Sequence, residues 1–144
     1  MTQETIYLDN NATTRVAQEV FEAMKPFFCD RYGNPSSIHR FGGLVSRAIT
    51  AAREQVAALL GAHPEEIYFT SCGSESDNMA IRGFCEAHGK SSRCITSTVE
   101  HPAVRNMCFY LRDQGCSLIE IPVDENGNID IDALRGSDID SNTL

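Results

Sequence analysis

With 144 residues, 42% of them hydrophobic, the chain is long enough for one modest domain, yet no window approaches the ~20 apolar residues of a membrane-spanning helix. The formal net charge of -8 comes from scattered acidic residues without a basic stripe, which argues against nucleic acid or an anionic membrane as the main partner. Residues 1–5 show neither a basic nor an apolar segment. No secretory signal is therefore evident, and we expect a cytoplasmic protein.

The N-terminal stretch predicts a loop followed by a helix. Ile6–Leu8 is a short extended run, and the polar turn 9–14 after it carries side chains that favour irregular backbone. Apolar residues from 17 to 28 follow helical spacing, with Pro26 near the expected end of the helix. The polar turn is the type of loop that can line a site.

A long ordered loop and a second helix come next. Residues 31–43 are rich in glycine, proline, asparagine and serine, which predicts a loop on the surface or over a cleft. Asn34 and His39 are expected to bond within this loop. Residues 44–60 show the clearest helical pattern of the chain, and Gly61 is a natural stop at the helix C-terminus.

The remaining chain alternates strands and helices, which predicts an α/β fold with a mostly parallel sheet. We expect an N-terminal segment over 1–60 and the first part of an α/β domain over 61–144. Residues 136–144 give no structured ending, so the chain looks cut rather than completed. The predicted elements are a strand at 67–70, a helix ending near Gly89, a strand at 93–98, a helix from about 100 to 114, a strand at 117–121, a turn at 124–128 and a short helix from Asp130.

The stretch 67–81 reads as a strand, a turn and a helix that could bind an anion. The first amides of a helix are unpaired and carry partial positive charge, so a phosphate over Gly73, Ser74 and Glu75 needs no cationic side chain. The hydroxyls of Ser74 and Ser76 could add donors. On the local pattern alone, an ordinary helix cap is the commoner structure.

That alternative uses the same residues without a ligand. Ser71 or Ser74 would cap the helix, and Asp77 would complete a loose capping box.

Six cysteines show no Cys-x-x-Cys pair and no spacing with histidine that suits zinc. Neither a disulfide framework nor a metal site is indicated, and we expect most of them to be free, buried thiols. The cysteines are Cys29, Cys72, Cys85, Cys94, Cys108 and Cys116.

Four stretches of the chain are distinctive when taken together: Tyr7–Thr14, Tyr32–His39, Phe69–Asn78 and Val99–Val104. In this order they resemble one family, the pyridoxal-phosphate (PLP) dependent cysteine desulfurases of the NifS/IscS type, in the class V aminotransferase group. The resemblance covers the chain up to about Leu134, with a weaker match at 122–127. It implies part of a fold-type I, aspartate-aminotransferase-like large domain.

The resemblance assigns roles to particular residues. Gly73 and Ser74 match the turn that binds the cofactor phosphate, although the family usually has threonine at Ser74. His101 matches the histidine that lies against the pyridine ring, where an imidazole can also move protons. Without the family, His101 would be interpreted as a helix-start residue capping nearby backbone.

For four further residues the resemblance implies less. Asn10, Asn11 and Thr13 match a loop on the substrate side of the cleft, but they could equally form a turn that bonds itself. Cys72 lies beside the phosphate turn, and the family's acceptor cysteine lies far downstream, so Cys72 is interpreted as a small packing residue.

Other parts of the family's site have no match in this chain. The only lysines, Lys25 and Lys90, do not lie in the sequence context of the Schiff-base lysine. The acceptor cysteine, the aspartate that pairs with the pyridine nitrogen and the substrate-binding arginine are also missing. We therefore interpret the chain as about the first third of such an enzyme, inactive by itself.

The implied full-length enzyme converts L-cysteine to L-alanine as a homodimer and passes sulfur, as a persulfide, to a scaffold for iron–sulfur clusters or other thio-cofactors. Two alternatives stay open from the sequence. One is a selenocysteine lyase or another class V transaminase, and the other is a non-catalytic module that docks on a full-length partner.

Overall fold

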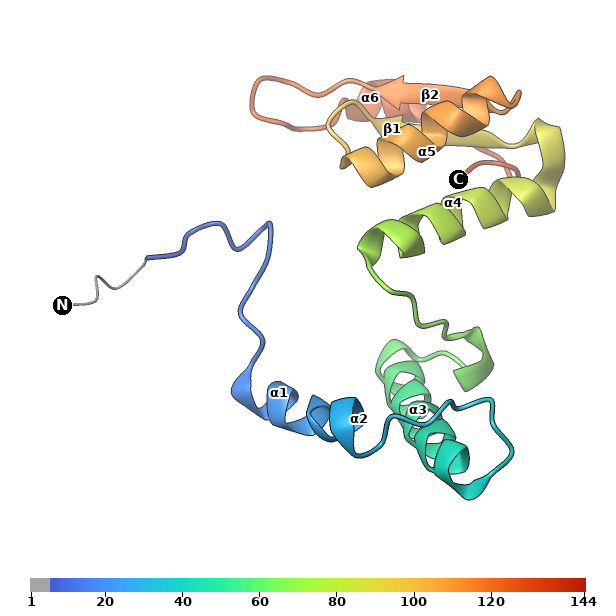
Figure 1. Cartoon of the computed structure of the whole chain (residues 1–144). Coiled ribbons are helices and arrows are strands. Elements are labelled where there is room, and N and C mark those ends of the chain that lie inside the picture. Colours follow the sequence, from blue (N-terminus) through green and yellow to red (C-terminus); the bar gives the residue numbers. More distant parts are fainter. Residues whose placement is uncertain (1–5) are drawn as a thin grey trace. The chain divides into compact units, whose positions relative to one another are not determined.

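A computed structural model of the chain describes residues 6–144, with only the backbone for Lys90. Residues 1–5, on which the expected lack of a secretory signal depends, lie outside the described residues. The chain forms two compact units, one ending at Tyr68 and the other running from Phe69 to Leu144. Figure 1 shows their elements in chain order. No helix in the described part of the chain is both long and apolar enough to cross a membrane.

The first unit begins with two short helices, α1 (Gln18–Met24) and α2 (Pro26–Cys29). The single helix predicted over 17–28 is thus interrupted at Lys25. The reason is Pro26, which has no N–H to donate to the preceding turn and takes the first position of α2, where a missing donor does no harm.

The long helix α3 (Arg40–Leu60) confirms the clearest sequence pattern and begins four residues earlier than residue 44. His39 caps it, because its Nδ1 accepts a hydrogen bond of 3.2 Å from the Gly42 amide. Gly61 ends the helix in the left-handed region at φ 67°, and its amide donates to the Ala57 carbonyl. The loop before α3 is correspondingly shorter than predicted.

The loop before α3 packs closely on the first turn of that helix. Asn34 Oδ1 accepts from the Ser36 amide at 2.9 Å, as predicted for loop bonding. A Cβ atom on Gly42 would lie only 2.4 Å from the Asn34 carbonyl oxygen. Only glycine at position 42 therefore allows the loop to close on the helix.

The strand predicted at 67–70 is wrong. A short 3-10 helix, η1 (Pro64–Glu66), follows α3, and Arg53 of α3 donates from Nε to the Ile67 carbonyl at 3.0 Å. Ile67 has extended backbone (φ −96°, ψ 121°), but no strand among residues 6–144 pairs with it. Extended conformation is a local property, whereas a strand exists only with a hydrogen-bonded neighbour.

The second unit contains the α/β structure that the sequence predicts. Its two strands are β1 (Arg93–Ser97) and β2 (Ser117–Ile121), which are parallel and are connected by helix α5 (Pro102–Asp113). Arg93 lies opposite Ser117, and Ser97 lies opposite Ile121. Parallel neighbours need such a crossover connection, so β1, α5 and β2 form a βαβ unit. The elements are α4 (Gly73–His88), η2 (Gly89–Ser91), β1 (Arg93–Ser97), α5 (Pro102–Asp113), β2 (Ser117–Ile121) and α6 (Ile131–Arg135).

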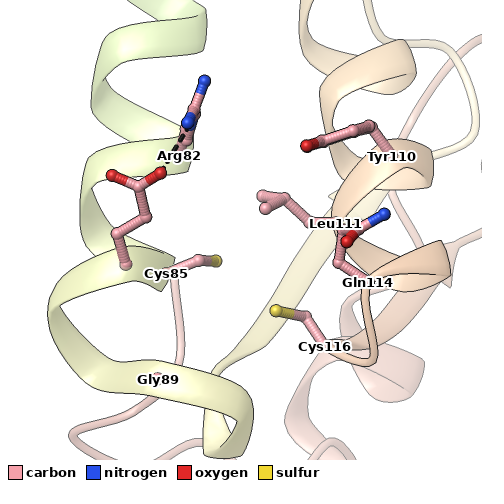
Figure 2. A pocket seen from close by; sticks show the side chains of 8 residues that line it. Arg82, Cys85, Gly89, Tyr110, Leu111, Gln114 and Cys116 are labelled. Atoms are coloured by element: carbon pink, nitrogen blue, oxygen red, sulfur yellow. Dashed lines mark hydrogen bonds and ion pairs between the residues drawn. The ribbon is translucent and has the colours of Figure 1, made fainter.

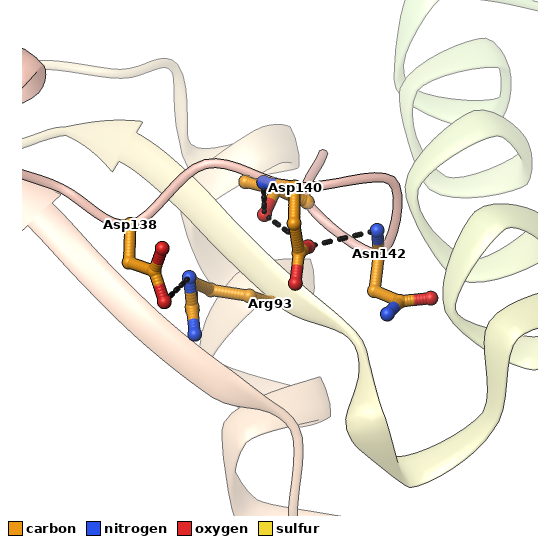
Figure 3. Close-up of polar contacts among 5 residues, drawn as sticks. Arg93, Asp138, Asp140 and Asn142 are labelled. Carbon is orange, nitrogen blue, oxygen red and sulfur yellow. Dashed lines mark hydrogen bonds and ion pairs between the residues drawn. The ribbon is translucent and has the colours of Figure 1, made fainter.

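The last residues are ordered against β1, which corrects the expectation of an unstructured ending. The amide of Leu144 donates to the Arg93 carbonyl, and the Ile95 amide donates to the Leu144 carbonyl, each at 2.9 Å. Figure 3 shows the ion pair of Arg93 with Asp138, at 3.7 Å. Strand β1 therefore has β2 on one edge and the chain end on the other, a pairing that sequence periodicity does not reveal.

The core of the second unit lies where α4 and α5 pack together over the strands. Its buried members are Cys85, Cys94, Cys108 and Leu111. The C-terminal parts of α4 and α5 line one cavity, so the two helices run in the same direction and begin at the same end of the unit (Figure 1).

Leu111→Ala tests whether this small core stabilises the second unit. Leu111 is 5% exposed, and removing its buried side chain should lower the free energy of unfolding by about 2–5 kcal/mol, measured by urea denaturation. Leu59→Ala is the matched control, since Leu59 is 84% exposed on α3 and should change stability by less than about 0.5 kcal/mol. Equal effects of the two substitutions would contradict this account of the core.

Two glycine substitutions should change the free energy of unfolding in opposite directions. Gly61→Ala forces a side chain into the left-handed region and should destabilise the chain by about 1 kcal/mol. Gly83 lies inside α4, and a Cβ there would meet nothing within 4 Å, so Gly83→Ala should stabilise by roughly 0.5–1 kcal/mol. Thermal unfolding followed by circular dichroism measures both, and a shift of the same sign would refute the assignment.

Candidate functional site

The N-terminus of α4 presents backbone donors that no side chain caps. Cys72 is the N-cap residue, in extended conformation, and its side chain makes no capping hydrogen bond. The amides of Gly73, Ser74 and Glu75 have no partner within the helix, because the first turn of a helix never supplies one. A Cβ placed on Gly73 would meet nothing within 4 Å, so the space over this turn is open.

The capping box expected as the alternative is wrong. Neither Ser71 nor Ser74 is the N-cap residue, and Asp77 does not take the third helical position. Instead, the Glu75 carboxylate turns back and accepts from the Ser71 amide at 2.5 Å and from the Ser71 hydroxyl at 2.7 Å. These bonds lower the pKa of Glu75, first through the hydroxyl and then through the amide. The spacing of a serine and a glutamate four residues apart is the sequence pattern from which these hydrogen bonds could have been predicted.

A second pair of side chains stabilises the turn, and it includes Ser76, which we expected to donate to a bound anion. Ser76 Oγ lies 2.6 Å from Thr70 Oγ1, and the Thr70 hydroxyl also donates to the Cys72 carbonyl at 3.2 Å. Ser76 therefore holds the turn in place, which leaves Ser74 as the residue expected to add a hydroxyl donor.

The pKa of the Cys72 thiol shows that this turn favours negative charge. This pKa is lowered, chiefly by the nearby backbone N–H of Glu75 and then by the Ser71 hydroxyl, which favour the charged form of the sulfur. Cys72 is exposed. Because a thiol is a weak acceptor, a stronger anionic acceptor such as a phosphate oxygen would bind these amides more tightly.

His101 lies at the N-terminus of α5. Its Nδ1 accepts from the Ala103 amide at 3.1 Å, and Pro102 takes the first helical position. This is the capping geometry that the local pattern alone predicts. Because Nδ1 is an acceptor, the neutral ring carries its proton on Nε2. The exposed imidazole can therefore cap α5 and still present Nε2 to a ligand.

The fold brings these two helix N-termini to one end of the second unit. Helices α4 and α5 begin on the same side (left in Figure 1), and α5 follows directly on the C-terminal end of β1. The Thr98 amide donates to the Ile121 carbonyl at 3.0 Å, so β1 and β2 end together. In open α/β sheets, ligands bind at the carboxyl ends of the strands. Gly73, Ser74 and His101 thus share the end at which a ligand is expected.

The polar loop of the first unit forms a turn. The amides of Ala12 and Thr13 donate to the Asp9 carbonyl at 3.1 Å and 3.4 Å, and Asn10 and Asn11 lie exposed within this turn. Because the loop belongs to the other unit, a role of Asn10, Asn11 and Thr13 on the substrate side stays a prediction.

Comparison with known proteins points to one family for the chain as a whole. Residues 6–143 match the family model "Aminotransferase class-V". A cysteine desulfurase of Trichormus azollae is 54% identical over 132 residues, which are 92% of this chain and 33% of that protein. A solved NifS-like protein has a TM-score of 0.84 at 39% identity, over 94% of this chain and 37% of its own.

A second structure, described as SspA in complex with cysteine, has a TM-score of 0.85 at 38% identity and covers 97% of this chain and 40% of its own. The chain thus spans about a third of the length of the curated relatives that it matches. The relatives confirm the family resemblance and the fold-type I architecture. The chain belongs to the class V aminotransferase family and is similar to its cysteine desulfurases.

Proposed function

We propose that this chain is the N-terminal part of a PLP-dependent cysteine desulfurase and supplies half of the cofactor site. The observation that carries the proposal is the uncapped N-terminus of α4, which lies at the same end of the unit as His101. The sequence identity to proteins named cysteine desulfurase supports desulfuration of cysteine as the reaction class.

The residues at α4 fit the phosphate of PLP. A dianionic phosphate gains from first-turn amides and from the partial positive charge of the helix N-terminus. Gly73 leaves room for the phosphate oxygens, and Ser74 adds a hydroxyl. The negative charge of Glu75 is already held by Ser71, which reduces its competition for the same amides.

His101 would hold the pyridine ring of the cofactor. The Ala103 amide donates to Nδ1 of His101, so the backbone of α5 sets the orientation of the imidazole ring. Nε2 then carries the proton that the residue can donate to, or recover from, the substrate side. When bound, PLP supplies an electron sink for the bonds next to the amino carbon.

The proposed reaction takes L-cysteine as the substrate. Its sulfur passes to an enzyme thiol as a persulfide, and L-alanine is released. The Schiff-base lysine and the acceptor cysteine would come from a segment outside these residues. We further propose a cytoplasmic homodimer that delivers sulfur to a scaffold protein for iron–sulfur cluster or thio-cofactor assembly. In this proposal, residues 1–60 form the N-terminal segment and 61–144 begin the cofactor domain.

A chimeric enzyme tests the proposal. This chain replaces the corresponding part of the Trichormus azollae cysteine desulfurase, and alanine released from L-cysteine is measured. We expect turnover from the chimera, and none from the 144-residue chain alone with PLP. His101→Ala should lower kcat by about 10²–10⁴-fold, because a positioned proton-transfer group is lost.

His63→Ala serves as the control for the chimera, since His63 is an exposed helix cap in the first unit and should leave kcat unchanged. A chimera that folds as a dimer and binds PLP but releases no alanine would overturn the proposed function. Turnover by the isolated chain would overturn the proposal that this chain supplies only half of the cofactor site.

Ser74→Ala tests the phosphate contact in the same chimera. Loss of one hydrogen bond to a charged group, worth about 1.5–3 kcal/mol, should raise the Kd for PLP by about tenfold or more. Ser74→Thr should restore the affinity. Ser91→Ala is the matched control, because its hydroxyl bonds the His88 carbonyl at the other end of α4. An unchanged Kd in Ser74→Ala would exclude the hydroxyl from the site.

A further inference from the structure

Four thiols meet in the core of the second unit, away from the proposed cofactor site. Cys85 comes from α4, Cys94 from β1 and Cys108 from α5, and each is less than 5% exposed. Cys116, between α5 and β2, is only partly buried and packs against them. The Cys85 and Cys94 sulfur atoms lie 3.6 Å apart. In the described part of the chain, no group of three or more His, Cys, Asp or Glu side chains is placed to hold a metal ion.

Two of the four thiols face a cavity. The cavity has a volume of about 290 Å³ and lies between the C-terminal parts of α4 and α5. Figure 2 shows the sulfur atoms of Cys85 and Cys116 directed into it from opposite sides. Cys94 and Cys108 do not line it. The lining residues are Arg82, Cys85, Glu86, Gly89, Tyr110, Leu111, Gln114 and Cys116.

Position separates the four thiols more clearly than electrostatics does. Burial raises the pKa of Cys94 to about 12 and also raises the pKa of Cys108, and neither side chain lines the cavity, so both are poorly placed to react with a reagent inside it. The pKa of Cys116 is raised as well, first by burial and then by neighbouring Cys85. Cys116 is nevertheless the most accessible of the four, and a reagent in the cavity reaches its sulfur first.

We propose that Cys85 and Cys116 form a dithiol modification site, which a small aliphatic disulfide entering this cavity oxidises to an internal disulfide. The site is independent of the proposed cofactor function. Its ligand class follows from the largely apolar walls of the cavity and from the two sulfur atoms that face each other across it.

The chemistry needs no other reactant. The thiolate of Cys116 attacks one sulfur of the small disulfide, breaks its S–S bond and releases one small thiol, which takes up the proton lost by Cys116. Cys85 then attacks the Cys116 sulfur and releases the second small thiol with the second proton. Two protein thiols lose two electrons in total, and the small disulfide gains them. The product ties α4 to the end of α5.

Peptide mapping of the whole chain tests the proposal. The exposed Cys29 and Cys72 are first replaced by serine, because they would cross-link separate molecules. The folded chain is then treated with 2-hydroxyethyl disulfide, quenched with acid, alkylated and cleaved by trypsin without reduction. The four remaining cysteines fall in four separate tryptic peptides, 83–90, 94–105, 106–112 and 113–135.

We expect peptide 83–90 to be linked to peptide 113–135, with two thiols lost per chain. Adding Cys116→Ser should abolish the link, whereas Cys94→Ser should keep it. A link between 83–90 and 94–105 would overturn the proposal, since it would show that the closely spaced buried pair reacts instead. Finding all four thiols alkylated after treatment would overturn it too. The treated chain keeps all four core cysteines, so this result could not come from a substitution that disturbs the core.

Discussion

The packing of α4 against α5 is the constraint on which the rest of the second unit depends. Cys85 of α4 and Leu111 of α5 are buried together over β1, and the C-terminal parts of both helices line one cavity, so the two helices run in the same direction. In the first turn of α5, Pro102 has no N–H and the Ala103 amide already donates to His101 Nδ1. Parallel packing therefore brings the unpaired first amides of α4 and the His101 imidazole to one end of the unit. The site and the core are thus two consequences of one arrangement.

The donor groups of the candidate site are backbone amides rather than cationic side chains. This suits a chain whose formal net charge is -8, since a phosphate can be bound locally without a basic surface. The polar side chains around the turn mostly hold the backbone, as the pairs Ser71–Glu75 and Thr70–Ser76 show. A preorganised turn pays less ordering entropy when an anion binds.

Large apolar side chains remain exposed in both units, among them Ile38 and Leu59 in the first unit and Met79 and Ile139 in the second. The buried thiols of the second unit, by contrast, are enclosed by that unit alone.

The sequence by itself determined α3 with its stop at Gly61, the strands β1 and β2, and the turn at Gly73, because these depend on local periodicity and backbone preference. Only the tertiary structure decided that 67–70 forms no strand and that the chain end pairs with β1, since strand pairing depends on which segments become neighbours. The same holds for the site. Sequence marked Gly73, Ser74 and His101 separately, and the parallel packing of α4 and α5 set them at one end, because side-chain burial between distant segments has no local signature.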